Sequence, residues 1–297
     1  MNKNDALGNR MKTYENVTRN YLTRRMPVII RIDGKAFHTF TRGLKKPFDA
    51  IFVKSMQDTM KYLCENIQGC VLGYTQSDEI TLVLVDYQNR DTSAWFDNNI
   101  QKMVSVSASM ATLAFNRAFV KNIDDEIMEY RSSFVPQSVE IQQRIKLYHD
   151  TLKKSAEKGA MFDSRVFNIP KEEVVNCLIW RQQDATRNSI QSVGQANFSH
   201  KQLDGKNCSD IQDMLMTEND INWNDYPTHL KRGSCCIKED YFIPSENGKG
   251  IRFPEGCSDP FTDDEIEKGT WRTRWVIDNE IPIFTQNKDY INKLIFI

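Results

Sequence analysis

The sequence predicts an α+β fold in which an antiparallel sheet carries helices on one face and is followed by a helical or mixed lobe. A β-branched run over residues 28–32 ends in the turn pair Asp33-Gly34, which indicates a strand and its end. Two apolar runs flank the polar tip from Gln76 to Glu79, which indicates a β-hairpin. With helical patterns after the first strand and after the hairpin, the order becomes β-α-β-β-α. That order begins a ferredoxin-like split unit.

The elements before the hairpin follow from their periodicity. Residues 11–24 favour a short polar helix, and residues 26–33 favour a strand. A helix is expected from about Pro47 to Asn66, because a proline near its start and Asp49 in its first turn suit a helix N-terminus. Its core-facing side chains recur at intervals of three and four residues: Phe52, Met56, Met60, Leu63 and Ile67.

The hairpin is expected to be followed by a helix and then by a polar stretch. Asp97 is expected to cap a helix from Asn98 to about Val120. The polar stretch 121–160 is expected to form an exposed arm or linker. We therefore divide the chain into a first domain, residues 1–136, and a C-terminal lobe, residues 137–297. In the second hairpin strand, the side chains are expected to alternate between the two faces of the sheet. One face is expected to carry Ile80, Leu82 and Leu84, and the other Thr81, Val83 and Val85.

The C-terminal lobe contains one helix with an unusual polar row. A strand is expected in MFDSRVFNIP, and Pro170 then introduces the helix. Asp184 and Arg187 are spaced to form an ion pair that either only staples the helix or belongs to a polar row that lines a cleft. The core face is expected to hold Val174, Val175, Leu178 and Ile179, and the polar row Trp180, Asp184 and Asn188, flanked by Arg181 and Arg187.

Composition limits the classes of function. The hydrophobic content of 40% and the charged content of 27% are typical of a soluble globular protein. No apolar run of membrane-spanning length and no N-terminal secretion signal is recognised, and the seven cysteines lack metal-ligand spacing, so we expect a reduced, cytoplasmic protein without a membrane partner. Four widely separated histidines give little material for a zinc site or a Ser-His-Asp triad. The net charge of −1 neither indicates nor excludes nucleic acid.

Two carboxylates are the strongest chemical signal. Asp33 lies at a predicted strand end and Asp78 at a predicted hairpin tip, where a sheet can hold carboxylates beside open space. Two such groups brought together repel each other, and a pair of divalent cations relieves that repulsion. The pattern therefore predicts a two-metal site, of the kind that usually handles phosphates.

Seven short segments follow one another along the chain: RIDGKAFHTFTR, KPFD, YTQSDEITLVL, FDNNIQKM, FDSRVFNIP, WRQQDATRNS and HLKRG. Together and in this order, they resemble the tRNA-His guanylyltransferase family over roughly residues 11 to 285. The resemblance implies a fold like the palm of polymerases and nucleotidyl cyclases, and addition of nucleotides to the 5′ end of tRNA in the 3′-to-5′ direction.

The resemblance also assigns roles to residues. Asp33 and Asp78 correspond to carboxylates that hold two Mg²⁺ ions, and Gly34 corresponds to a backbone carbonyl ligand in a tight turn. Glu79 either joins this site or forms a salt bridge, because adjacent side chains on a hairpin tend to point to opposite faces. Contacts to the nucleotide are expected from Asp33, Gly34, Lys35, Ala36, Phe37, His38, Ser77 and Asp78, with Lys46 and Lys102 near its phosphates, and contacts to the 5′ end of tRNA from Arg181, Asp184, Arg187 and Asn188.

One departure selects among the family's activities. After Asp184, residues 185–190 replace the motif of the eukaryotic enzymes and retain only Asn188, which resembles the bacterial and archaeal tRNA repair proteins. The implied function is template-directed repair, with 5′-end activation by ATP or GTP, transfer of a nucleotide from an NTP, and a homotetrameric enzyme. The alternatives are addition of a single G to tRNA-His, and a palm-type nucleotidyl cyclase or a catalytically silent tRNA-binding module.

Overall fold

The computed structural model describes residues 5–132, 138–243 and 270–296, and its centre is one six-stranded antiparallel sheet. The strand order is β4-β1-β3-β2-β5-β6, so the strand that ends in Asp33 pairs with the second strand of the hairpin. The predicted α+β class is confirmed. The strands are β1 Val28–Gly34, β2 Cys70–Gln76, β3 Glu79–Leu84, β4 Phe162–Asn168, β5 Ser234–Ile243 and β6 Thr270–Asp278.

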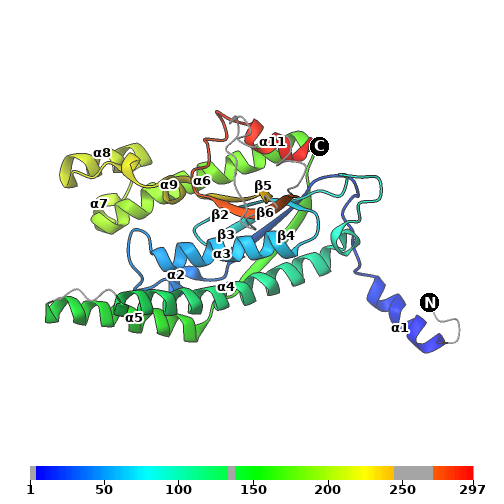
Figure 1. Ribbon diagram of the computed structural model, residues 1–297, viewed down its shortest axis with the longest axis horizontal. Coiled ribbons are helices and arrows are strands. Elements are labelled where there is room, and N and C mark those ends of the chain that lie inside the picture. The colour runs from blue at the N-terminus through cyan, green and yellow to red at the C-terminus, as the bar shows by residue number, and fades with distance from the viewer. Residues whose placement is uncertain (1–4, 133–137, 244–269, 297) are drawn as a thin grey trace.

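Helices surround the sheet and extend beyond it (Figure 1). The α-helices are α1 Ala6–Asn16, α2 Phe37–Phe40, α3 Ala50–Asn66, α4 Ile100–Ser132, α5 Val139–Lys158, α6 Lys171–Asn197, α7 His200–Leu203, α8 Cys208–Asn219, α9 Thr228–Arg232 and α11 Asp289–Ile295. Two short 3-10 turns are η1 Trp95–Asn98 and η2 Trp223–Asp225.

One face of the sheet is covered by α3 and α4, as the split β-α-β pattern predicts (Figure 1). The expected alternation of β3 is present, because Leu82 belongs to the core under these helices and Val83 to the core on the other face. The apolar face predicted for α3 is buried here, with Met60 and Leu63 fully inaccessible to solvent. Each fully buried aliphatic side chain contributes roughly 1.5–3 kcal/mol, so this layer is a major source of stability.

The second face is covered by α6 and α11, which come from the C-terminal part of the chain (Figure 1). Val174 and Leu178 of α6 are fully buried, as the predicted core face of that helix requires. They pack with Ile291 of α11 against β1, β2 and β3. The helices of the β-α-β-β-α unit, α3 and α4, thus lie on one face of the sheet. The apolar second face is covered by α6 and α11.

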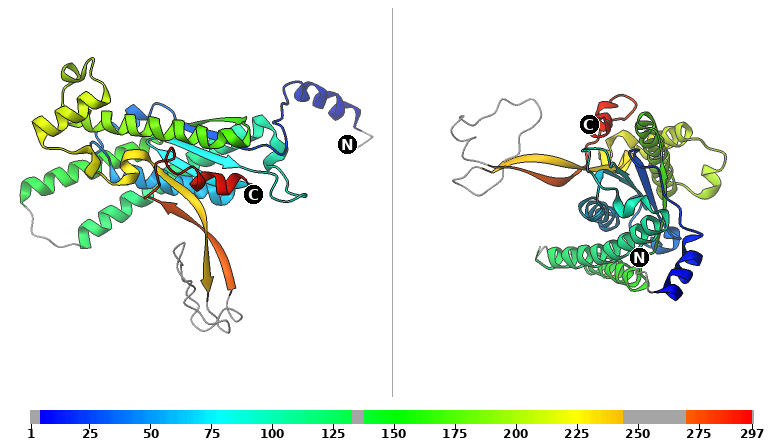
Figure 2. Two further views of the ribbon diagram at one scale, coloured as in Figure 1. Left: turned by 90° about the horizontal axis from the view of Figure 1, so that it is seen from above. Right: turned by 90° about the vertical axis from the view of Figure 1, so that its right-hand side faces the viewer.

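The predicted boundary between residues 136 and 137 lies outside the described residues. The sheet combines strands that come before this boundary in the sequence with strands that come after it. Strands β4, β5 and β6 follow the boundary in sequence, yet β4 pairs with β1 and β5 pairs with β2. Beyond the sheet, β5 and β6 continue as a two-stranded ribbon that projects from the body (Figure 2).

Two helix predictions need correction. The N-terminal helix occupies residues 6–16 rather than 11–24 and buries no side chain. Asp97 does not cap α4, because its carboxylate accepts a hydrogen bond from Arg24 at 2.6 Å and its backbone lies in the left-handed region. Asn99 takes the capping role instead, and its side-chain oxygen accepts from the Lys102 backbone N–H at 3.0 Å.

Helix α4 is also longer than predicted. It continues through the polar residues after Val120 to Ser132, because Asn122 and Ile123 are buried against the body and hold the extension in place. Helix α4 is long and apolar enough to cross a membrane. No apolar run of membrane-spanning length was recognised in the sequence. One such helix is weak evidence, because the core helix of a soluble protein has the same composition. Its apolar side chains Met103 and Phe115 are fully buried in the core with α3.

The stretch expected as an exposed arm is largely a helical hairpin, in which α5 runs back along α4 (Figure 1). Three contacts attach α5 to the end of α2 and to the loop before α3. The Tyr148 hydroxyl donates to the Asp49 carboxylate at 2.8 Å, and the Lys45 ammonium lies 4.1 Å from the centre of the Tyr148 ring. The Ser155 hydroxyl donates to the Phe40 carbonyl at 3.1 Å. Asp49 itself is the N-cap of α3 and accepts from the Phe52 N–H.

We expect Tyr148→Phe to lower the free energy of unfolding by roughly 1.5 kcal/mol, because it removes a hydrogen bond to a buried carboxylate. Urea denaturation would measure the loss. Tyr14→Phe is the matched control, because Tyr14 lies on α1 and is 69% exposed. Equal stability of the two variants would contradict the contribution assigned to the Tyr148–Asp49 bond.

Candidate active site

The end of β1 and the tip of the β2–β3 hairpin bring two carboxylates together. Asp33 lies opposite Glu79 in the β1–β3 register, so Asp78 is next to it at the tip. The Gly34 backbone N–H donates to the Asp78 carbonyl at 3.1 Å and ties the two segments. Both aspartates are half-buried. The juxtaposition predicted from the strand-end pattern is therefore present.

The two carboxylates are electrostatically uncompensated within the described part of the chain. Burial raises the pKa of the Asp78 carboxyl, and the charge of Asp33 adds to that rise. The Ser77 hydroxyl, 3.0 Å from Asp78, opposes it. No described side chain forms an ion pair with either Asp33 or Asp78. A cation bound between them would remove this repulsion.

The donor set fits a hard divalent cation. Across residues 5–132, 138–243 and 270–296, no three His, Cys, Asp or Glu side chains cluster closely enough to form a complete metal cage. Mg²⁺ does not need such a cage, since it is usually bound through one or two carboxylates together with water and substrate phosphate oxygens. Asp33 and Asp78 supply that pair.

Glycine is needed at position 34 for space rather than for a left-handed turn. A Cβ atom there would lie 2.2 Å from the Phe37 ring. The expected tight turn falls instead on Ala36, which has φ of 55°, and on Ser77, which has φ of 49°. Non-glycine residues in this region are uncommon and cluster at functional sites. The Phe37 side chain lies in the core rather than beside a ligand, because it packs against Phe40, Phe52, Phe115 and Phe162.

Glu79 forms the salt bridge that was one of its two predicted roles. An Arg181 guanidinium nitrogen lies 2.8 Å from its carboxylate, and both side chains are less than a tenth exposed. Arg31 approaches the same carboxylate at 3.6 Å. Burial raises the pKa of Glu79, while the two guanidinium groups oppose that rise. The guanidinium of Arg181 also lies 3.6 Å from the centre of the Trp180 ring. Arg181 thus joins α6 to the hairpin, and its side chain is only 5% exposed.

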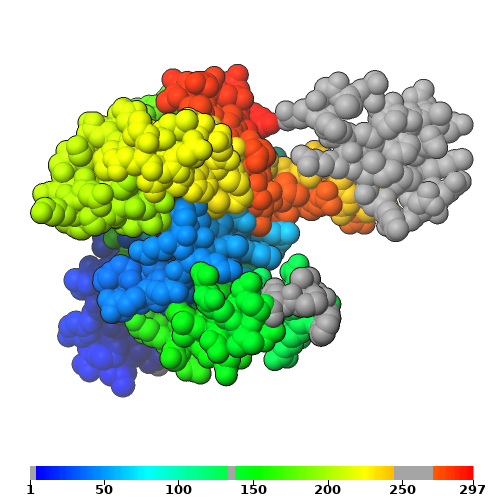
Figure 3. All heavy atoms as spheres, turned by 90° about the vertical axis from the view of Figure 1, so that its left-hand side faces the viewer, coloured from blue at the N-terminus to red at the C-terminus, as the bar shows by residue number. Residues whose placement is uncertain are grey.

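A cavity of about 570 Å³ opens beside the hairpin tip. One wall comes from α2, the loop before α3 and the start of α3, and the opposite wall from α6 and α9. Figure 3 shows the α2–α3 region, in blue, between the α6–α9 region, in yellow-green, and the α4–α5 hairpin, in green. Of the predicted nucleotide and tRNA residues, the lining includes His38, Lys46, Ser77 and Asn188.

Other predicted residues lie outside this lining. Lys35 and Ala36 are exposed near the end of β1. Lys102 is exposed in the first turn of α4, with its ammonium 5.7 Å from the centre of the Phe96 ring. Asp184 and Arg187 form the predicted ion pair, in which Arg187 is 56% exposed. Asp184 lies one turn before Asn188 and Arg187 is its direct neighbour in the chain, yet of these three residues only Asn188 lines the cavity.

The sequence prediction missed most of the cavity wall. Apart from Lys46, the loop of residues 41–49 was given no part in ligand binding, and neither were Ser192, Gln195 and His229. The segments KPFD and HLKRG contain part of this wall and were noticed only as points of resemblance.

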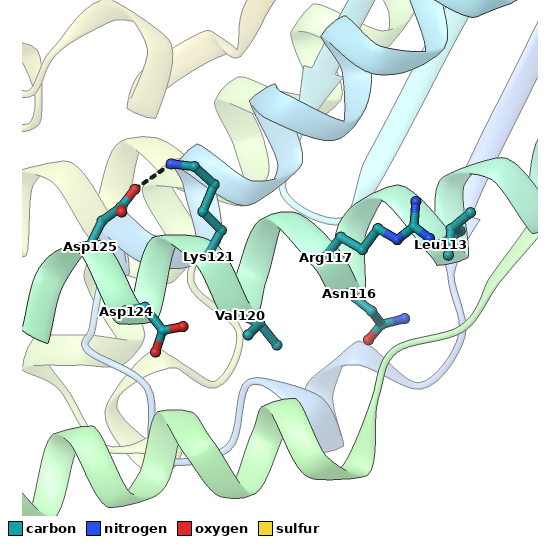
Figure 4. A pocket seen from close by; sticks show the side chains of 7 residues that line it. All are labelled: Leu113, Asn116, Arg117, Val120, Lys121, Asp124 and Asp125. Carbon is teal, nitrogen blue, oxygen red and sulfur yellow. Dashed lines mark hydrogen bonds and ion pairs between the residues drawn. The ribbon is translucent and has the colours of Figure 1, made fainter.

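A second hollow, of about 630 Å³, lies on the outer surface of α4 (Figure 4). All seven side chains that line it come from this single helix, including the exposed ion pair between Lys121 and Asp125. It shares no lining residue with the cavity beside Asp78, and we assign no chemistry to it.

Comparison with known proteins identifies relatives along nearly the whole chain. Residues 8–170 match the family model described as tRNAHis guanylyltransferase. A bacterial tRNA(His) guanylyltransferase-like protein in complex with ATP is 40% identical, with a TM-score of 0.73 and coverage of 98% of this chain and 99% of that one. A bacterial protein of the same description in complex with GTP is 37% identical, with a TM-score of 0.70 and coverage of 99% and 100%. The tRNA(His) guanylyltransferase of Schizosaccharomyces pombe is 25% identical over 77% of this chain and 79% of its own.

The buried position of Arg181 and the exposed position of Arg187 lead to opposite expectations. Arg181→Ala should lower the free energy of unfolding by roughly 3 kcal/mol, because it leaves the Glu79 carboxylate buried beside only the more distant Arg31. Arg187→Ala should cost at most ~1 kcal/mol, because exposed ion pairs contribute little. Urea denaturation would compare the two variants. Equal losses would refute the structural role of Arg181, and adding Glu79→Gln should restore part of the Arg181→Ala loss.

Proposed function

We propose, for a chain that belongs to the tRNAHis guanylyltransferase family, that it repairs the 5′ end of truncated tRNA by template-directed addition of nucleotides. Membership in the family makes the chain a 3′-to-5′ nucleotidyltransferase. The observation that supports the site is the uncompensated pair of Asp33 and Asp78 beside a cavity lined by Ser77 and His38. A carboxylate pair next to a cavity of this size suits a nucleoside triphosphate with its phosphates at the carboxylates.

Two Mg²⁺ ions are part of the proposal. When bound, they would neutralise charge on the reacting phosphates and lower the pKa of an attacking hydroxyl. Asp33 and Asp78 would hold them through carboxylate oxygens, and Gly34 through its backbone carbonyl. The uncompensated charge of the pair supports this assignment.

The reaction would need no protein nucleophile. In the first step, the 5′-phosphate of the tRNA displaces pyrophosphate from ATP, or from GTP, and gives a nucleotide-activated end. In the second, the 3′-hydroxyl of an incoming NTP attacks the activated 5′-phosphate and expels the nucleoside monophosphate. The chain's task is to hold these groups in line, since positioning and electrostatic stabilisation dominate phosphoryl transfer. Ser77, which is next to Asp78 in the chain, lines the cavity together with His38, and this supports assigning both side chains to the triphosphate.

Helix α6 supports repair over addition of a single untemplated G. Of the residues that follow Asp184, Ala185 and Ser189 are buried and Asn188 lines the cavity, so the altered segment forms part of the site wall. A change in this wall is expected to change which 5′ end is accepted. We further propose a homotetramer with tRNA as its partner, on the resemblance to the family, which light scattering and native gel shifts would test.

The decisive assay uses tRNA that lacks its first nucleotide, incubated with ATP and each NTP in turn. We expect extension only by the nucleotide complementary to the opposing base of the acceptor stem. A tRNA with a 5′-triphosphate should be extended without ATP activation. Addition of G regardless of the opposing base would instead establish the tRNA-His guanylyltransferase activity, and absence of any extension would support a silent RNA-binding protein.

Replacement of either carboxylate should separate activity from folding. Asp33→Ala and Asp78→Ala are each expected to reduce nucleotide addition by roughly a thousandfold or more, because bound cations contribute several kcal/mol to the transition state. Thermal unfolding in EDTA should be unchanged or shifted upward, because the variants lose a repulsion. Activity within about tenfold of the unaltered enzyme would refute the metal assignment.

A further inference from the structure

The register between β1 and β4 places like charges opposite each other. Asp163 lies opposite Asp33, and Arg165 lies opposite Arg31. Directly opposed side chains on neighbouring strands have their Cβ atoms about 4.5–5.5 Å apart, and like charges in such pairs destabilise a sheet. A ligand of the opposite charge would relieve each pair. For the two carboxylates, the proposed Mg²⁺ ions do so. For the two guanidinium groups, the matching ligand is an anion.

These four side chains lie on the face of the sheet that α6 partly covers. Successive residues of a strand point to opposite faces, and Ile32 and Phe162 belong to the core under α3 and α4. Phe167 of β4 packs in the other core, under α6 and α11. Nearer the carboxylates this cover ends, because the side chains of Asp163 and Arg165 are 56% and 54% exposed. The sheet surface beside Asp33 is therefore open to a ligand.

The two opposed guanidinium groups differ in how readily they can bind an anion. Arg31 is only 22% exposed and lies 3.6 Å from the buried Glu79 carboxylate. Among the described residues, Arg165 forms an ion pair with Asp163, at 3.3 Å. Exposed ion pairs contribute little free energy, so Arg165 can exchange this contact for another anion. A guanidinium binds a phosphate through two parallel hydrogen bonds, which makes phosphate a well-matched ligand.

An exposed aromatic ring adjoins these cations. Trp180 of α6 is 49% exposed, and the Arg31 guanidinium lies 5.4 Å from the centre of its ring. Surfaces that bind single-stranded nucleic acid combine cations, which hold the phosphates, with aromatic rings, on which bases stack. Arg165, Arg31 and Trp180 therefore form a patch whose chemistry suits the end of an RNA chain.

The order of the strands separates this patch from the cavity. In the sheet β4-β1-β3-β2-β5-β6, β4 adjoins β1, whereas the cavity is lined by Thr75 of β2 and Ser234 of β5. Asp33, at the end of β1, and Asp78, at the β2–β3 tip, lie between the two sides. A reaction that joins a nucleotide to an RNA end brings two substrates to the same carboxylates. With the nucleoside triphosphate assigned to the cavity, the β4 side is left for the RNA.

We propose that the 5′ end of the tRNA reaches the carboxylates over β4, and that the Arg165 guanidinium binds its terminal phosphate. The assignment rests on the proposed function, which supplies the RNA end. It gives Arg165, in the segment FDSRVFNIP, a ligand contact that the sequence did not predict.

The test measures binding of the full chain, with Mg²⁺ and no NTP, to an acceptor-stem RNA hairpin that lacks its first nucleotide. The hairpin carries either a 5′-monophosphate or a 5′-hydroxyl, and fluorescence anisotropy gives the Kd of each. We expect the unaltered chain to bind the phosphorylated hairpin about tenfold more tightly, as one charge-assisted contact provides. Arg165→Ala should abolish this preference and leave ATP binding, measured by calorimetry, unchanged.

Two further variants make the result specific. Arg165→Lys should keep part of the preference, because an ammonium retains the charge but not the paired hydrogen bonds. Arg117→Ala is the matched control and should keep all of it, because Arg117 is an exposed arginine on α4, which covers the opposite face of the sheet.

Several results would overturn the assignment. A full preference in Arg165→Ala, or none in the unaltered chain, would show that Arg165 does not hold the 5′-phosphate. Equal weakening of both hairpins would place Arg165 on the RNA away from its 5′ end, and weaker ATP binding would assign it to the nucleoside triphosphate instead. Failure of the proposed function is distinguishable, because it appears as absence of nucleotide addition by the unaltered chain, a reaction that the binding measurement does not require.

Discussion

The antiparallel register between β1 and β3 is the constraint from which the site follows. Since Asp33 lies opposite Glu79, the end of one strand and the start of the other coincide at the same edge of the sheet. A slip of one residue would turn Asp33 and Arg31 to the opposite face and place Ile30 and Ile32 outside their core. The same apolar packing that stabilises the sheet therefore also fixes the distance between the two carboxylates. The strand register that buries the apolar side chains of β1 is thus also the register that brings the two carboxylates together.

The buried pair of Glu79 and Arg181 extends this arrangement to the second half of the chain. It joins the β2–β3 hairpin to α6, because Arg181 follows Glu79 by 102 residues in the chain. Because a buried ion pair recovers its desolvation only with good geometry, it limits how α6 can lie on the sheet. The orientation of α6 in turn sets where Asn188 meets the cavity. An interaction without a direct chemical role thereby aligns the two walls of the site.

The sequence predicted correctly those features that depend mainly on residues close together in the chain. The alternation of β3 and the apolar face of α3 came from periodicity, and the pairing of Asp33 with Asp78 from a strand end and a hairpin tip. Predictions failed where a distant partner decides the outcome. Asp97 does not cap α4 as expected, because its carboxylate accepts a hydrogen bond from Arg24. Helix α4 continues beyond its apolar stretch, because Asn122 and Ile123 are buried. His229 could not be placed by any local signal, because its cavity is formed by segments far apart in the chain.

The Asp49 carboxylate, which is only 4% exposed, accepts three hydrogen bonds from three different places. They come from the Lys45 and Phe52 backbone N–H groups and from the Tyr148 hydroxyl. The cavity loop, the first turn of α3 and the α4–α5 hairpin are thereby coupled in one cooperative unfolding unit. Transient opening of the hairpin would release the loop as well, so the amide protons of both should exchange with solvent at related rates. The α4–α5 hairpin is thus expected to set the lifetime of the folded cavity loop.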